Sequence, residues 1–196
     1  MGLSLWLVPP RDVATKLRTI MKTKTSTSKS PSSFPHFEPH VTLATVPSST
    51  PLDDLRAAIP LGQPVVPVTF RSVDVGSKYF MSVYVTVHHT GELNTLRDNL
   101  KTSLGEQAVP PLAHVSLFYI DDSDAEERTK VEEQLERDGR IVRIADDRTA
   151  LNCAEDPAES SKDDLLDGFD GGEIWIALCD GPVPTWTVKD RIKLPL

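Results

Sequence analysis

Two short runs of the chain carry side chains that could move protons. The first is His40-Val41-Thr42-Leu43 and the second is His114-Val115-Ser116-Leu117. An imidazole has an unperturbed pKa of ~6.5, so near neutrality one histidine can accept a proton while another donates one. A hydroxyl beside each imidazole can donate a hydrogen bond to a charged oxygen. These residue types together predict acid–base chemistry on a group that carries a charged oxygen.

Both runs have the composition of a β-strand, in which successive side chains point to opposite faces. His40 therefore shares a face with Thr42, and His114 shares a face with Ser116. Strict alternation places Tyr119 on the face opposite to His114. One such run alone is typical of a buried histidine with satisfied hydrogen bonds. Two similar runs favour a pair of histidines that work together.

The pattern of apolar residues around these runs predicts alternating strands and helices. Strands are predicted at residues 2–8, 37–46, 64–75, 78–88, 113–120, 141–145, 149–153, 173–179 and 185–194. Helices are predicted at residues 13–21, 51–59, 92–104 and 122–137. Asp12 is expected to cap the first helix, and Gly76-Ser77 is expected to turn a hairpin. Segments 22–33 and 155–172 are predicted to be loops. The first is interpreted as a flexible, solvated connection, and the alternative is a mobile flap whose lysines help attract phosphate.

A helix follows each motif strand, so the chain reads as two related halves. We expect an α+β fold in one domain, residues 1–196, with two pseudo-symmetric lobes. Each lobe would carry an antiparallel sheet facing a central cleft, with the helices outside.

Composition excludes several classes of function. A chain of 196 residues can bury a substantial core, and its net charge of −8 argues against a protein that coats long nucleic acids. No apolar run is long enough to cross a membrane, and no signal peptide is recognisable, so we expect a cytoplasmic monomer. Cys153 and Cys179 are interpreted as buried thiols rather than a disulfide framework. His88-His89 has no acidic or cysteine partner at ligand spacing, so no metal site and no cofactor are expected.

The duplicated motif resembles the 2H phosphoesterase superfamily, and within it the cyclic phosphodiesterases of plants and fungi. Further matching runs are Ser4-Leu5-Trp6-Leu7-Val8-Pro9, Pro39-His40-Val41-Thr42, His114-Val115-Ser116-Leu117-Phe118-Tyr119 and Glu173-Ile174-Trp175-Ile176-Ala177-Leu178-Cys179. The resemblance implies the bilobal 2H phosphoesterase-like fold. It also implies that His40 and His114 are catalytic and that Thr42 and Ser116 bind phosphate. The additional cysteines of the plant proteins are missing, so no family disulfide is expected.

The resemblance further implies a metal-independent hydrolase of small cyclic phosphodiesters. The expected substrates are 2′,3′-cyclic nucleotides, opened to 2′-phosphates, and ADP-ribose 1″,2″-cyclic phosphate, opened to ADP-ribose 1″-phosphate. Plant and fungal enzymes of this kind act downstream of tRNA splicing. We expect His114 to be the base that activates water and His40 to be the acid, because Tyr119 matches a family tyrosine near the water.

Tyr119, Trp6 and Trp175 are candidate contacts to the substrate or to water, and packing in the core is the alternative for each. Phe37, Phe80 and Tyr84 are further aromatic candidates. Three other functions remain open from the residues. They are an RNA-end phosphodiesterase or ligase-like protein of the same fold, a nucleotide-binding module without catalysis, and a structural partner-binding domain.

Overall fold

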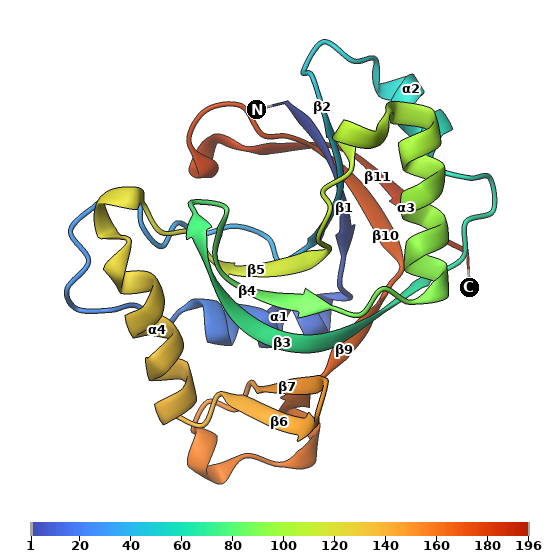
Figure 1. Cartoon of the computed structure of the whole chain (residues 1–196). Coiled ribbons are helices and arrows are strands. Elements are labelled where there is room, and N and C mark those ends of the chain that lie inside the picture. The colour runs from blue at the N-terminus through green and yellow to red at the C-terminus, as the bar shows by residue number, and fades with distance from the viewer. Residues whose placement is uncertain (1, 196) are drawn as a thin grey trace.

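The computed structural model describes residues 2–195, and its main feature is one antiparallel sheet (Figure 1). The strand order of this eight-stranded sheet is β11-β10-β1-β2-β5-β4-β3-β9. Its strands are β1 (Leu3–Val8), β2 (Val41–Val46), β3 (Val66–Lys78), β4 (Met81–Val87), β5 (His114–Phe118), β9 (Gly168–Gly171), β10 (Glu173–Leu178) and β11 (Thr187–Lys193). A small second sheet contains β6 (Ile141–Ala145), β7 (Arg148–Asn152) and β8 (Leu165–Leu166).

Four α-helices accompany the sheets. They are α1 (Arg11–Met21), α2 (Leu52–Ala58), α3 (Gly91–Leu104) and α4 (Glu126–Arg137). In Figure 1, α2 and α3 lie together on one side of the molecule, and α4 lies on the other side near the small sheet. Short 3₁₀ helices occur at Glu106–Ala108, Asp122–Asp124, Pro157–Glu159, Lys162–Asp164 and Val183–Thr185. No helix within residues 2–195 is long and apolar enough to cross a bilayer.

The chain order shows two related halves. The succession β1-α1-β2-α2 is repeated as β4-α3-β5-α4, and the strands β2 and β5 that carry the two motifs lie at the centre of the sheet. The helix of each half packs on the motif strand of the other, because α1 contacts β5 and α3 contacts β2. The expected two-lobed α+β fold is confirmed. The strands of the two lobes form one eight-stranded sheet, in which the motif strands β2 and β5 are neighbours.

The core beneath this sheet extends through both halves. Leu17 and Ile20 of α1 and Leu93, Leu96 and Leu100 of α3 are fully buried, as their helical spacing predicts. The same core cluster includes the apolar residues of β2 and β5. The two halves therefore depend on each other for burial of their apolar faces.

Four predicted details differ from the structure. The first helix begins at Arg11 with Pro10 at its N-cap position and no side-chain cap, so the prediction for Asp12 was wrong. Proline fits this position because its fixed φ suits the extended backbone that directly precedes the helix (φ −54°, ψ 157°). The first hairpin turns at Tyr79-Phe80, three residues after the predicted turn, because β3 continues to Lys78.

The glycine-rich segment 155–172 is only partly a loop, because it contains β8 and β9. Strand β9 pairs with the start of β3, with Gly168 opposite Thr69. A Cβ on Gly168 would lie 2.1 Å from the carbonyl oxygen of Val68, so only glycine permits this close pairing.

Segment 22–33 is held by α4 and its preceding turn rather than hanging free. The buried carboxylate of Asp124 accepts hydrogen bonds from Ser28 Oγ, the backbone N–H groups of Lys29 and Ser30, and Ser33 Oγ, at 2.8–3.2 Å. The hydrogen bond from Ser30 N–H, with those from its neighbours, lowers the pKa of Asp124 to about 2. The segment is a connecting loop, as predicted, but this charged anchor holds its second half in place.

Candidate active site

Strands β2 and β5 bring the four motif residues to one cavity of about 280 Å³. The lining residues are Ser4, Trp6, His40, Thr42, Thr45, Phe80, Met81, Pro110, His114, Ser116, Tyr119, Cys179 and Trp186. His40 lies directly before β2, and His114 is the first residue of β5. Thr42 and Ser116 follow on the same faces, so all four residues singled out by sequence lie at this cavity.

A β-bulge interrupts each motif strand at the same position. Leu5 pairs with Ala44 but Trp6 pairs with Thr42, so Leu43 is the extra residue in β2. An extra residue places two consecutive side chains on the same face, so the alternation after the bulge is opposite to the alternation before it. The result is two consecutive core residues, Leu43 and Ala44, and a return of the chain to the cavity at Thr45.

The second motif repeats this irregularity. Tyr84 pairs with Ser116 but Val83 pairs with Phe118, which makes Leu117 the extra residue in β5. Leu117 and Phe118 are both in the core, and Tyr119 turns into the cavity. Strict alternation predicted the opposite face for Tyr119, and the bulge is the physical reason why that prediction was wrong.

Both imidazoles are oriented by backbone carbonyl groups. His40 Nδ1 lies 2.6 Å from the carbonyl oxygen of Glu38, and His114 Nδ1 lies 3.1 Å from that of Leu112. A carbonyl can only accept, so each Nδ1 carries the proton and donates it. In the neutral form, the unprotonated nitrogen of each ring is therefore Nε2, which is free to take a proton from a ligand.

An aromatic ring on the neighbouring strand fixes each imidazole further. Trp6, the register partner of Thr42, stacks on His40 with ring centroids 4.0 Å apart and planes at 16°. Tyr84, the register partner of Ser116, meets His114 edge-on with centroids 5.2 Å apart. Each histidine is thus contacted by an aromatic ring from the equivalent position of the neighbouring strand, a tryptophan for His40 and a tyrosine for His114.

Burial changes the proton affinity of the two histidines unequally. Burial lowers the pKa of His40 from 6.5 to about 4, because the charged ring would lose its water. Burial also lowers the pKa of His114, helped by the positive charge of Arg97. His40 is 5% exposed and His114 is only half-buried, so His114 is the easier of the two to protonate.

Three hydroxyls surround the histidines. Ser116 Oγ donates to the carbonyl oxygen of Phe80 at 2.9 Å, while Thr42 Oγ1 has no hydrogen-bond partner among residues 2–195. Tyr119 stacks on Phe37 with centroids 3.9 Å apart and lines the same cavity as Ser116. Burial raises the pKa of the Tyr119 hydroxyl, so it remains a neutral donor.

The other aromatic candidates divide between this cavity and its surroundings. Trp6 and Phe80 line the cavity, whereas Phe37 supports Tyr119 from behind. The structure does not bring Trp175 to the histidines. Its ring lies in a separate cavity under the Arg191 guanidinium, 4.4 Å from the ring centroid, and its Nε1 donates to Glu173 at 2.9 Å.

Trp186 is the main wall residue that sequence reasoning missed. It lies between the short Val183–Thr185 helix and β11, and its ring is near those of Trp6 (6.0 Å), Phe80 (5.7 Å) and Tyr119 (6.2 Å). The one signal in the sequence that could have indicated Trp186 is its position as an aromatic residue between prolines and polar residues. Cys179 also lines the cavity as a free thiol, and burial raises its pKa to about 12.

Comparison with known proteins gives one consistent family. The family described as cyclic phosphodiesterase-like protein matches residues 1–194. A 2′,3′-cyclic-nucleotide 3′-phosphodiesterase of Yarrowia lipolytica (strain CLIB 122 / E 150) is 30% identical over 220 aligned positions, which cover 96% of this chain and 97% of the relative.

Two solved structures share the fold at low sequence identity. A crystal structure described as a phosphoesterase has a TM-score of 0.57 and 14% identity, with 99% of this chain and 98% of that chain covered. The E. coli LigT structure, complexed with phosphate, has a TM-score of 0.54 and 13% identity, with 100% and 98% covered. The similarity in both extends over the whole two-lobed arrangement.

Proposed function

We propose that this chain, which belongs to the cyclic phosphodiesterase-like family, is a phosphodiesterase that opens small cyclic phosphodiesters with water. The proposed substrates are 2′,3′-cyclic nucleotides, converted to 2′-phosphates, and ADP-ribose 1″,2″-cyclic phosphate, converted to ADP-ribose 1″-phosphate. The observation that supports this most directly is the pair of Nδ1-anchored imidazoles, each with a hydroxyl two residues on, at one cavity.

The hydrolysis needs one proton acceptor and one proton donor. Water attacks phosphorus, its oxygen forms the new P–O bond, and its proton passes to a neutral imidazole. The bond from phosphorus to the leaving sugar oxygen breaks, and a protonated imidazole gives that oxygen its proton. The leaving oxygen is the 3′ oxygen of a 2′,3′-cyclic nucleotide and the 2″ oxygen of the ADP-ribose substrate. Each transfer by a well-placed side chain is worth roughly 10²–10⁴ in rate.

Unequal burial supports a definite assignment of these roles. His40, with its pKa near 4, is neutral at physiological pH and suits the base. His114 is less buried and takes up a proton more readily when the substrate's negative charge arrives, so it suits the acid. This order is the reverse of the one expected from the family tyrosine.

The hydroxyls are proposed to hold the non-bridging oxygens of the phosphate. Thr42 is unpartnered in the described chain, and Tyr119 adds a second hydroxyl just after the end of β5. The Ser116 hydroxyl, which donates to the carbonyl of Phe80, would rotate to donate to the bound phosphate instead. Negative charge increases on these oxygens as water attacks, so neutral donors aimed at them stabilise the transition state more than the bound substrate. Because the imidazoles supply both proton transfers, we propose that no metal is needed to generate hydroxide.

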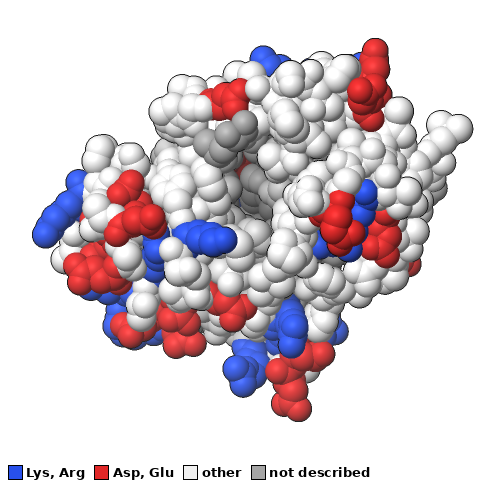
Figure 2. All heavy atoms as spheres, turned by 45° about the horizontal axis from the view of Figure 1, so that its top comes forward, with Lys and Arg blue, Asp and Glu red and all other residues white. Residues whose placement is uncertain are grey.

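The charge distribution supports a small substrate. Figure 2 shows one face of the molecule, on which Lys and Arg are scattered among Asp and Glu rather than gathered in one broad positive area. Contacts to the phosphates of long nucleic acids require many such cations in a continuous stripe. With the net charge of −8, this favours a nucleotide-sized ligand.

The experiment is turnover of 2′,3′-cyclic AMP and ADP-ribose 1″,2″-cyclic phosphate in the presence of EDTA. Wild type is compared with His40→Ala, His114→Ala and the control His89→Ala, which changes a histidine outside the cavity. We expect both cavity variants to lose about 10²-fold or more while the control keeps wild-type activity. Absence of wild-type turnover, or activity restored only by added metal, would contradict the proposal.

A further inference from the structure

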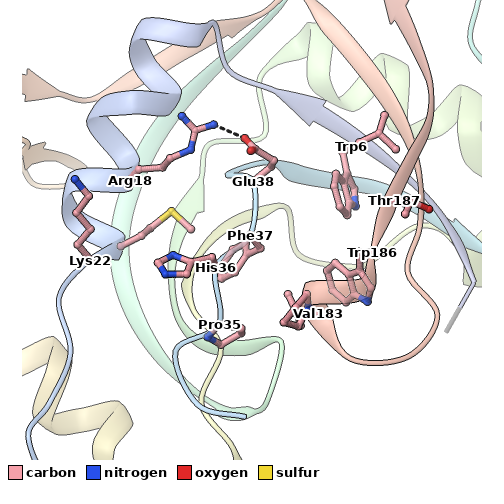
Figure 3. Close-up of a pocket in the computed structure, with 13 residues that line it drawn as sticks. Trp6, Arg18, Lys22, Pro35, His36, Phe37, Glu38, Val183, Trp186 and Thr187 are labelled. Atoms are coloured by element: carbon pink, nitrogen blue, oxygen red, sulfur yellow. Dashed lines mark hydrogen bonds and ion pairs between the residues drawn. The ribbon is translucent and has the colours of Figure 1, made fainter. Parts of the chain in front are cut away.

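A second cavity of about 330 Å³ adjoins the one that holds the histidines (Figure 3). The two cavities share Trp6 and Trp186 as walls. Figure 3 shows Arg18 of α1 and Lys22, the residue directly after α1, on one side, with Trp186 and Val183 on the other. Each cavity has about the size of a small-molecule site. A ligand longer than one nucleoside could therefore occupy both at once.

The two cavities differ in charge. The histidine cavity is lined by no Lys, Arg, Asp or Glu side chain. The second cavity contains two cations, Arg18 and Lys22, and one carboxylate, Glu38. Arg18 forms an ion pair with Glu38, while Lys22 is exposed and has no ion-pair partner within residues 2–195. The second cavity thus has a net positive charge and free donors on Lys22 and on the remaining N–H groups of Arg18.

Two direct contacts connect the second cavity to the catalytic histidine. Glu38, whose carboxylate pairs with Arg18, holds His40 Nδ1 through its own backbone carbonyl. Trp6 stacks on His40 and also forms part of the wall of the second cavity. A group bound there is therefore separated from the His40 ring by the shared wall residue Trp6.

The chemistry of the sugar limits what that group can be. A ribose with a cyclic phosphate on two of its ring hydroxyls keeps its exocyclic hydroxymethyl arm, which ends in the 5′ oxygen, besides the base or hydroxyl on the remaining ring carbon. If that oxygen carries a phosphoryl group, the arm is anionic and matches the positive cavity. ADP-ribose 1″,2″-cyclic phosphate and an oligonucleotide ending in a 2′,3′-cyclic phosphate share this feature, whereas a nucleoside 2′,3′-cyclic phosphate lacks it.

We infer that the second cavity binds, through Lys22 and Arg18, a phosphoryl group on the 5′ oxygen of the reacting ribose. The preferred substrates are then cyclic phosphates of 5′-phosphorylated ribose rather than of simple nucleosides. This inference rests on the proposed function, because it assumes that the cyclic phosphate lies between His40 and His114.

The test compares substrates that differ only at the 5′ oxygen. Adenosine 2′,3′-cyclic phosphate and its 5′-phosphorylated form are assayed with wild type, Lys22→Met, Lys22→Arg and the control Lys24→Met. Lys24 is an exposed lysine two residues further along the same segment and outside the cavity. We expect wild type to prefer the 5′-phosphorylated substrate in kcat/KM by roughly tenfold, the gain from one charged hydrogen bond.

Lys22→Met should lose most of this preference, Lys22→Arg should keep it, and Lys24→Met should equal wild type. High salt should reduce the preference, since the cavity is open to solvent. Equal kcat/KM for the two substrates in wild type, or equal loss of preference in Lys22→Met and Lys24→Met, would overturn the inference while leaving the proposed hydrolysis intact.

A binding measurement separates the inference from the proposed function. By calorimetry, adenosine 2′,5′-bisphosphate should bind wild type more tightly than adenosine 2′-phosphate, and Lys22→Met should remove the difference. This result is independent of turnover, so a protein that hydrolyses nothing can still pass or fail it. Assays with ADP-ribose 1″,2″-cyclic phosphate and with a dinucleotide 2′,3′-cyclic phosphate then distinguish the two sources of the 5′-phosphoryl group.

Discussion

Val41 pairs with Val115, and within residues 2–195 this is the one register pair that joins β2 to β5. Each valine directly follows a motif histidine and is fully buried. The contact between the two halves of the sheet is thus one residue away from both imidazoles. Because α1 packs on β5 and α3 on β2, each half also supports the motif strand of the other. The distance between the histidines is therefore set by the core itself.

Shortening the side chain of Val41 should lower the stability of the fold. Val41→Ala removes buried methyl groups at the junction and is expected to lower the free energy of unfolding by about 2 kcal/mol. Denaturant unfolding measures this, with Val75→Ala as the control because Val75 is 40% exposed. Equal effects of the two substitutions would contradict a special role for the junction.

Tyr119→Phe should impair the reaction more than binding. The ring still stacks on Phe37, but the donor that the bulge turns into the cavity is lost. We expect kcat to fall by roughly 10- to 100-fold with a small change in KM, as for loss of one donor to a developing charge. Tyr79→Phe is the control, since the Tyr79 hydroxyl donates to the carbonyl of Ser32. A change in KM alone would place Tyr119 in binding only.

The rate should depend on pH in a bell-shaped way, displaced toward acid. A neutral His40 as base gives a rising limb near its pKa of about 4, and a protonated His114 as acid gives a falling limb below 6.5. The profile of kcat/KM for the free enzyme measures both limbs. A plateau extending well above pH 7 would contradict the lowered pKa of His114.

A substrate with a good leaving group distinguishes the acid from the base. A 2′-deoxyribose 3′-(p-nitrophenyl phosphate), which has no 2′-hydroxyl that could attack phosphorus in place of water, releases a phenolate that needs little protonation. The base on water should remain necessary, so His40→Ala should lose activity on this substrate while His114→Ala keeps much of it. The reverse outcome would assign the base to His114, as the resemblance of Tyr119 to the family tyrosine suggests.

Protonation of His40 should destabilise the fold in mild acid. Its pKa is about 4 when folded and ~6.5 when unfolded, so the unfolded chain binds the proton more readily. The contribution to stability is complete above pH 6.5 and is lost as pH falls toward 4, by up to about 3 kcal/mol. His40→Gln should flatten the unfolding free energy across this window. An unchanged pH dependence in His40→Gln would contradict the burial effect.

Asp124→Asn should release the segment that leads into the first motif. The charged carboxylate holds four groups of residues 28–33, and its lowered pKa means that this anchor weakens only as pH falls below 3.8 toward 2. We expect trypsin to cut at Lys24 and Lys29 several-fold faster in this variant at neutral pH. Asp98→Asn, on the exposed face of α3, serves as the control. Cleavage at the wild-type rate would show that the anchor is dispensable.

The sequence by itself determined the residues closest to the chemistry. In each motif the histidine and the hydroxyl residue are two positions apart. Every second side chain of a strand lies on the same face, so His40 shares a face with Thr42 and His114 shares a face with Ser116, whatever the rest of the fold. Apolar spacing likewise determined α1, α3 and most strands. The acidic net charge, which follows from composition alone, already disfavoured long nucleic acids as partners.

Only the tertiary structure decided how these pieces meet. The bulges at Leu43 and Leu117 exist only relative to the partner strands β1 and β4, so one strand's sequence could not reveal that Tyr119 faces the cavity. The second cavity combines α1, residues 35–38 and residues 183–188, which are far apart along the chain. Burial, which separates the proton affinities of His40 and His114, is likewise a property of the whole packed core, because it depends on every element that excludes water from the ring.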